Sequence, residues 1–324
     1  MKALALLVLL ATTGPAADSP EKIAQLLARY YGHDFDSPVY IPAMALIGQL
    51  RLGHLEEVQR LAAPYVDGAK DSLSNVTPSH LAGHLVFAEL AERTHDPRYT
   101  ARLQAAANLG FTAWDDMSDG VFMGCPLYAA AGKYDLALQH LRAMQKLCLR
   151  SDGLYRHSPL TDAAWGRGNA FPVLGLALTL SRIPRDNPAY PPVLKSLQQH
   201  AAVLAKYQTA DGMWREVIDH PESYKEFSAT AMIASAMVRA VRIGWLDSKT
   251  YQPLIDKAWT AIAARIGPSG ELTGVCESTG KQKSLEDYLH RKAINGRDAR
   301  GGGMALLFAT EICCVPGGYD KPVK

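Results

Sequence analysis

The sequence has no excess of charge of either sign. It carries 34 lysine and arginine residues against 32 aspartate and glutamate, a formal net charge of +2 over 324 residues. Proteins that hold a polyanion by bulk charge are far more basic, so nucleic acid is excluded as the main partner. Long hydrophobic runs are scarce too: the run at residues 3–11 is about half as long as a membrane span. We therefore expect no nucleic-acid partner and no membrane-embedded chain.

That short apolar run has the form of a secretory signal peptide. It follows Lys2 and leads into small residues up to Ala17, with Gly14 and Ala16 forming a small-x-small cleavage site. We expect residues 1–17 to be a signal peptide and the protein to be secreted or periplasmic. A buried N-terminal helix is the alternative interpretation.

Cysteine is also scarce, and its spacing shows no metal site. The chain has no CxxC pair and no His/Cys ligand spacing. An odd number of cysteines cannot pair completely within one chain, and buried thiols are the simplest interpretation. The five cysteines are Cys125, Cys148, Cys276, Cys313 and Cys314.

Strand-like alternation is missing as well, and helical periodicity takes its place. Apolar residues recur at helical spacing in twelve segments, with Pro38 and Pro188 just inside two starts and Gly132 and Gly244 at two ends. The predicted helices cover residues 19–31, 38–52, 55–67, 79–93, 98–112, 123–132, 134–149, 169–182, 188–209, 226–243, 247–266 and 301–315.

A second regularity is the pattern Asp-Gly-apolar-aromatic. It occurs at residues 119–122, 152–155 and 211–214, with a weaker echo at 269–272. Each copy follows a predicted helix, so the Asp-Gly pair predicts a turn that returns the chain to the core. Recurring units that cannot bury their own faces stack or close into a ring. We favour a closed α/α toroid in one domain, residues 18–324, over an open solenoid, because long loops interrupt the repeat.

In such a toroid the loops that lead from outer to inner helices share one rim. The residues around the Asp-Gly turns are rich in tryptophan, carboxylates and arginine, which suits a cleft that binds sugars. These rim residues are Trp114, Asp115, Asp116, Asp119, His157, Trp165, Arg167, Asn169, Trp214, Tyr224, Glu226 and Arg297.

Residues 165–171, with the sequence WGRGNAF, resemble the W-x-R-G-N-G-W signature of the unsaturated rhamnogalacturonyl hydrolases, glycoside hydrolase family 105. The unsaturated glucuronyl hydrolases of family 88 share a related signature. Three further segments match in order: residues 119–127, 207–231 and 272–280. The resemblance extends over most of residues 19–315.

The resemblance implies an (α/α)6 barrel and a particular reaction. The reaction is hydration of the C4–C5 double bond in an unsaturated uronic acid at the non-reducing end of a lyase-generated oligosaccharide. The two-carboxylate spacing rule for ordinary glycosidases does not apply to this chemistry. The resemblance implies no metal and no organic cofactor.

The resemblance also assigns roles to individual residues. Asp119 matches the catalytic acid/base, and its alternative is a turn aspartate like Asp152. Arg167 matches an arginine that contacts the substrate carboxylate, and a helix-start ion pair is the alternative. Trp165 matches a residue that stacks on the sugar, with a core wedge as the alternative. His157 matches a site histidine, with a surface loop position as the alternative.

Three more residues complete the substrate-binding candidates. Met123 lies in the segment that contains Asp119, and Arg297 lies in a predicted rim loop. Trp214 belongs to the third Asp-Gly copy, where a structural role competes with substrate contact. Residues 281–300 carry more positive than negative charge, which would attract an acidic oligosaccharide, unless they form a solvated loop.

The sequence departs from the family pattern in places. Gly120 replaces a second aspartate, and an early aspartate has no clear equivalent, since Ser79 or His80 stands there. Two alternatives follow: a toroid that binds acidic oligosaccharides without turnover, and another sugar-active enzyme such as an epimerase. An epimerase requires paired histidines at the rim.

Overall fold

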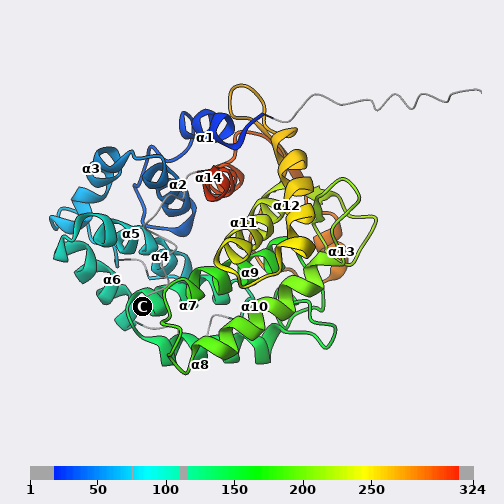
Figure 1. Ribbon diagram of the computed structural model, residues 1–324, viewed down its shortest axis with the longest axis horizontal. Coiled ribbons are helices and arrows are strands. Elements are labelled where there is room, and N and C mark those ends of the chain that lie inside the picture. Colours follow the sequence, from blue (N-terminus) through cyan, green and yellow to red (C-terminus); the bar gives the residue numbers. More distant parts are fainter. Residues whose placement is uncertain (1–17, 75, 110–115, 314–324) are drawn as a thin grey trace, which may run out of the picture.

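The computed structural model describes residues 18–74, 76–109 and 116–313. The expected signal peptide, Trp114 and Asp115 lie outside these ranges. In the described part of the chain, helices alternate between an outer and an inner layer of one ring (Figure 1). No helix in these ranges combines the length and apolar character needed to cross a bilayer.

The outer helices are amphipathic. In α8, for example, Ala137, Leu141, Met144 and Cys148 are buried at intervals of three and four residues, so one face packs inward. The outer layer consists of α1 (Pro20–Ala28), α3 (Leu55–Val66), α6 (Pro97–Leu109), α8 (Tyr134–Cys148), α10 (Tyr190–Ala205) and α12 (Ser248–Ala263).

The inner helices are buried on nearly all sides. In α9 every residue except Leu178 is buried, which is typical of a helix surrounded by protein. Small residues allow close packing: a Cβ on Gly175 of α9 would lie 2.7 Å from the Phe122 Cα of α7. The inner layer consists of α2 (Tyr40–Arg51), α4 (Pro78–Gly83) with α5 (Leu85–Thr94), α7 (Gly120–Ala130), α9 (Gly166–Leu180), α11 (Phe227–Ile243) and α14 (Ala299–Cys313).

The ring is closed. Each inner helix packs against the next, and α14 packs against α11 on one side and against α2 and α1 on the other (Figure 1). The predicted (α/α)6 toroid is therefore confirmed. One predicted helix, 79–93, is divided at His84, where α4 ends and α5 begins.

Short ribbons and one short helix occupy the rim loops. Strand β1 (Trp214–Arg215) pairs with β2 (Lys225–Glu226), and β3 (Leu272–Cys276) pairs with β4 (Ala293–Gly296), both antiparallel. Helix α13 (Leu285–Leu289) lies between β3 and β4 in the sequence. The sequence did not predict these elements, because each has five residues or fewer.

The inner helices all begin at one end of the ring, which we call the mouth. Each follows an outer helix of opposite direction, so the loops between them gather there. Beneath the mouth, aromatic rings from three inner helices meet: Tyr40 lies 5.9 Å from Phe122 and 5.5 Å from Phe171, and the latter two are 5.3 Å apart. This apolar floor supports the residues at the helix starts.

Candidate functional site

Asp119 stands at the N-terminal end of inner helix α7 and not in an ordinary Asp-Gly turn. Its backbone is helical, with φ −54° and ψ −28°. The turns at Gly153 and Gly212 have positive φ angles of 87° and 93°, a conformation that suits glycine. The repeated dipeptide therefore occurs in two structural settings: Asp119 lies in a turn that leads directly into α7, whereas the other two copies place a glycine at positive φ. The catalytic role of Asp119 stays a prediction.

The Asp119 carboxylate is buried and weakly engaged. The residue is 4% exposed, and within the described part of the chain its Oδ1 has no hydrogen-bond partner. The Nε2 of His157 lies 3.5 Å from this oxygen. By contrast, Asp211 is partly exposed and pairs with Lys225 at 2.8 Å. A buried carboxylate with one oxygen free of hydrogen bonds to the described residues is suited to proton transfer.

His157 is held on several sides. Its ring centroid lies 4.4 Å from the Trp165 ring, and its Nδ1 lies 2.7 Å from the Tyr288 hydroxyl. Its carbonyl accepts a hydrogen bond from the backbone N–H of Ser118, at 2.8 Å. The last bond ties the histidine to the residue before Asp119. The structure thus brings together two candidates that are 38 positions apart in the sequence, and the surface-loop alternative for His157 is wrong because the residue is fully buried.

Trp165 lies behind His157, at the start of α9, and is fully buried. The guanidinium groups of Arg167 and Arg291 each lie 4.9 Å from its ring. Its indole N–H donates to Oε1 of Glu216 at 2.8 Å. These contacts fix the indole plane, and stacking on a sugar stays a prediction for this residue.

Arg167 is also buried, and it binds the protein's own backbone. It donates to the carbonyls of Cys276 at 2.9 Å and Ser278 at 2.6 Å, and to the Ser228 hydroxyl at 3.1 Å. The Glu226 carboxylate lies 3.9 Å away, so the ion pair foreseen as the alternative is present. Arg167 thereby ties the end of β3 to the start of α11. Contact with a substrate carboxylate stays a prediction.

Two buried glutamates lie beneath these residues. Glu226 caps α11, accepting from the backbone N–H groups of Ser228 and Ala229 and from that of Cys276. Glu216 accepts from Trp165 and from the Cys276 thiol, at 3.1 Å. Burial, together with the nearby Glu226 carboxylate, raises the pKa of Glu216 to about 8. Glu216 is therefore neutral at pH 7 while its neighbour is positioned as an acceptor.

The other three candidates lie differently. Met123 is 5% exposed and follows Asp119 by one helical turn in α7. Trp214 is fully buried and donates its indole N–H to the Leu204 carbonyl at 2.8 Å, which is the structural role considered for it. Arg297 is exposed, with its guanidinium 4.2 Å from the Tyr30 ring. Tyr30 follows α1, and Nε of Arg297 donates to the Ser269 carbonyl at 2.9 Å, between α12 and β3; neither contact is with Asp119.

Three basic residues in or next to the loop that contains α13 are engaged within the protein. Lys281 pairs with Asp116 at 2.6 Å, and Arg300 pairs with Asp298 at 2.7 Å. Arg291 stacks on Trp165, as described above.

The sequence predicted that this loop faces the site, but it did not single out Tyr288 or Glu216. Their partners in the site lie 131 and 51 positions away, and no local motif marks them.

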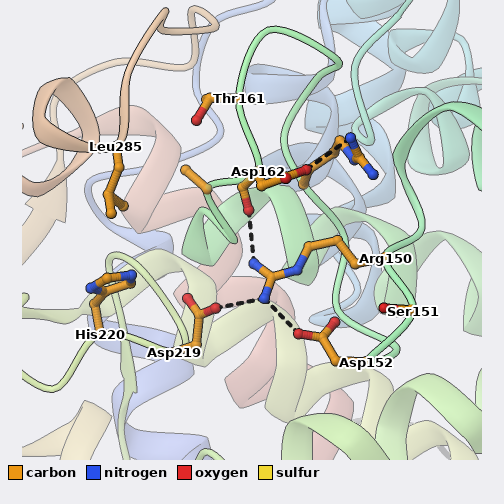
Figure 2. Close-up of a pocket in the computed structure, with 10 residues that line it drawn as sticks. Arg150, Ser151, Asp152, Thr161, Asp162, Asp219, His220 and Leu285 are labelled. Atoms are coloured by element: carbon orange, nitrogen blue, oxygen red, sulfur yellow. Dashed lines mark hydrogen bonds and ion pairs between the residues drawn. The ribbon is translucent and has the colours of Figure 1, made fainter.

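A neighbouring pocket of 390 Å³ opens on the same rim (Figure 2). At its centre Arg150 donates to Asp152 at 2.5 Å, Asp219 at 2.8 Å and the Asp162 carbonyl at 2.7 Å. Two carboxylates thus neutralise its only central arginine, so this pocket is poorly suited to an acidic sugar. Its lining residues are Arg150, Ser151, Asp152, Arg156, Thr161, Asp162, Ala163, Asp219, His220 and Leu285.

No metal centre is evident at the site. In residues 18–74, 76–109 and 116–313, no three His, Cys, Asp or Glu side chains are arranged to hold a metal ion. The cluster of Asp119, His157, Trp165 and Tyr288 consists of proton donors, proton acceptors and aromatic rings, which suits acid–base chemistry on a sugar.

The family model described as Glycosyl Hydrolase Family 88 matches residues 58–315. Among curated proteins, the unsaturated rhamnogalacturonyl hydrolase YesR of Bacillus subtilis is 30% identical over 155 residues, 47% of this chain and 42% of that protein. An unsaturated 3S-rhamnoglycuronyl hydrolase of Formosa agariphila is 35% identical over 104 residues, 31% of this chain and 27% of that protein. The chain therefore aligns with less than half the length of either relative.

Solved structures agree over nearly the whole chain. A possible family 105 member from Klebsiella pneumoniae superposes with a TM-score of 0.78 at 20% identity, covering 96% of this chain and 98% of the other. A family 88 glycosyl hydrolase from Bacteroides vulgatus gives 0.75 at 17% identity, covering 91% and 99%. At these identities the likeness establishes the fold.

Proposed function

Because the chain belongs to glycosyl hydrolase family 88, we propose that it hydrolyses oligosaccharides bearing an unsaturated uronic acid at their non-reducing end. The names of the two curated relatives support this substrate class. The observation that carries the proposal is the buried Asp119 carboxylate, whose Oδ1 has no hydrogen-bond partner among the described residues and faces His157.

In the proposed reaction one water molecule is added across the C4–C5 double bond. The Asp119 carboxyl group gives its proton to C4, and the ring oxygen stabilises the positive charge that develops at C5. Water bonds to C5 through its oxygen and returns one proton to the Asp119 carboxylate, so the acid is regenerated. The hemiketal formed at C5 opens, and the remainder of the oligosaccharide is released.

A direct test follows the ultraviolet absorbance of the conjugated double bond. We expect the protein to remove this absorbance from at least one lyase-generated disaccharide in a panel, and Asp119→Asn to slow the loss by at least about 100-fold. Asp211→Asn is the matched control, because it alters the same dipeptide in an ion-paired, partly exposed turn.

Two outcomes would refute this assignment. Unchanged turnover in Asp119→Asn would show that another group supplies the proton. Tight binding of the whole panel by folded protein without turnover would favour the non-catalytic binder, an alternative motivated by the missing early aspartate.

We further propose that residues 1–17 direct export. The N-terminal sequence of protein recovered outside the cytoplasm would test this proposal.

A further inference from the structure

The Tyr288 side chain joins the α13 loop to His157. The residue is fully buried, and its hydroxyl lies between two nitrogens: the backbone N–H of Gln282 at 3.0 Å and Nδ1 of His157 at 2.7 Å. Burial raises the pKa of Tyr288 to about 12, so the hydroxyl keeps its proton at neutral pH. The bonds around this oxygen can therefore be assigned by counting protons.

The backbone N–H of Gln282 can only donate, so this hydrogen bond occupies one lone pair of the Tyr288 oxygen. If Nδ1 of His157 also carried a proton, the oxygen would accept twice and its own O–H would have no acceptor among the described contacts. A buried hydroxyl without an acceptor costs about 1 to 3 kcal/mol. With Nδ1 unprotonated, the Tyr288 hydroxyl donates to it, and every hydrogen-bonding group at the Tyr288 oxygen then has a partner.

The protonation of the other ring nitrogen of His157, Nε2, follows from this assignment. A neutral imidazole has one N–H, and with Nδ1 as acceptor that N–H is at Nε2. Nε2 is the atom that lies 3.5 Å from Oδ1 of Asp119. The distance is long for a hydrogen bond, but catalytic contacts often shorten when substrate binds. The N–H is thus on the ring nitrogen that lies near Oδ1, the carboxylate oxygen without a hydrogen-bond partner among the described residues.

We propose that Tyr288 is a positioning residue that holds His157 as the Nε2–H tautomer directed at Asp119. This inference rests on the proposed role of Asp119. A donor at Oδ1 stabilises the carboxylate left when Asp119 has given its proton to the substrate, and it orients the other carboxylate oxygen toward the sugar.

The ring of Tyr288 is held independently of its hydroxyl. The Arg291 guanidinium lies 4.7 Å from its centroid and also stacks on Trp165. Arg291 is itself fixed by the Ser278 carbonyl at 3.1 Å. Tyr288→Phe therefore keeps the stacked ring and removes only the hydroxyl, which makes it a clean test.

The first test needs no substrate. Long-range nitrogen–proton NMR spectra of the labelled full chain near pH 7.5 report which nitrogen of each histidine is protonated, and His157→Gln identifies the His157 signals. We expect the Nε2–H tautomer in the wild type and loss of this preference in Tyr288→Phe. An Nδ1–H tautomer or a doubly protonated ring in the wild type would overturn the proposal.

The second test uses turnover. We expect Tyr288→Phe to lower kcat by about 10- to 100-fold while KM changes little. Tyr65→Phe is the control. Tyr65 lies in outer helix α3, and its hydroxyl donates to the carbonyls of Phe35 and Asp36 in the loop before α2. Wild-type kcat in Tyr288→Phe would overturn the proposal. If no substrate is turned over, the proposed function fails, while the tautomer is still decided by NMR.

Discussion

Glu216 is a carboxyl group surrounded by protein, and its protonation is linked to the stability of the fold. The unfolded chain ionises it near pH 4.5, whereas the folded protein keeps it protonated up to about pH 8, because burial and the Glu226 carboxylate oppose a second charge. Its contribution to stability is therefore fully present at acidic pH and is lost as the pH rises toward 8.

Glu216→Gln should remove this loss. Glutamine retains an acceptor for the Trp165 indole but cannot ionise, so the variant should gain stability relative to the wild type between pH 5 and pH 8. The expected gain is on the order of 4 kcal/mol, given 1.36 kcal/mol per pKa unit. Urea unfolding at the two pH values measures it. A constant difference between the two proteins would contradict the raised pKa.

At the scale of elements, one carboxylate joins three inner helices at the end of the ring opposite the mouth. Glu311 of α14 pairs with Arg239 of α11 and Arg51 of α2, each at 2.8 Å, and with Arg242 of α11. Although burial alone would raise it, the Arg239 and Arg51 guanidinium groups hold the pKa of Glu311 well below its usual range. The contribution of the ionised Glu311 to folding stability is therefore present at neutral pH and is lost in acid. The contribution of Glu216 has the opposite pH dependence.

Glu311→Gln should therefore destabilise the fold strongly. It removes the carboxylate that pairs with the buried Arg51 guanidinium, and breaking a buried ion pair costs about 3 to 5 kcal/mol. Chemical denaturation at neutral pH measures the loss. Glu57→Gln is the matched control, because Glu57 pairs with Arg60 on the exposed face of α3 and its loss should alter the midpoint little. Similar midpoints for both variants would contradict the structural role of the cluster.

The elements also show what the sequence could predict. All twelve ring helices were predicted, because apolar periodicity and flanking Pro and Gly are local signals. The division at His84 was missed, since nothing local in residues 79–93 marks it. The site was predicted only where a motif covers it: Asp119, His157 and Trp165 lie in recognisable segments. Tyr288 was missed because its role depends on a contact across the ring.

At the scale of the whole molecule, the ring directs six inner helices so that their N-terminal ends surround the mouth. Each helix start carries a partial positive charge, and anions are stabilised within its first turn. The net charge of +2 therefore understates the field at the site. We therefore expect the inner helix ends to add positive potential at the mouth.

This arrangement predicts a salt-dependent reaction. For an unsaturated uronate substrate, kcat/KM should fall by about 2- to 10-fold as ionic strength rises from about 0.02 M to 0.5 M, because salt screens the attraction. The matched substrate is the uncharged methyl ester of the same uronate, for which kcat/KM should change less. Initial rates at several salt concentrations measure both. Equal salt dependence would argue against electrostatic attraction at the mouth.

The contact of α14 with α1 bears on the order of folding. Five pairs of an inner helix and the following outer helix are joined at the end opposite the mouth, separated by at most nine residues in sequence. The pair α14 and α1, by contrast, meets only when the ring closes. Tyr31 donates to the Gly270 carbonyl at 2.6 Å across 239 positions of sequence. Joining such distant segments costs more loop-closure entropy than forming a single hairpin, so we expect this contact between α14 and α1 to form after the hairpins that it joins.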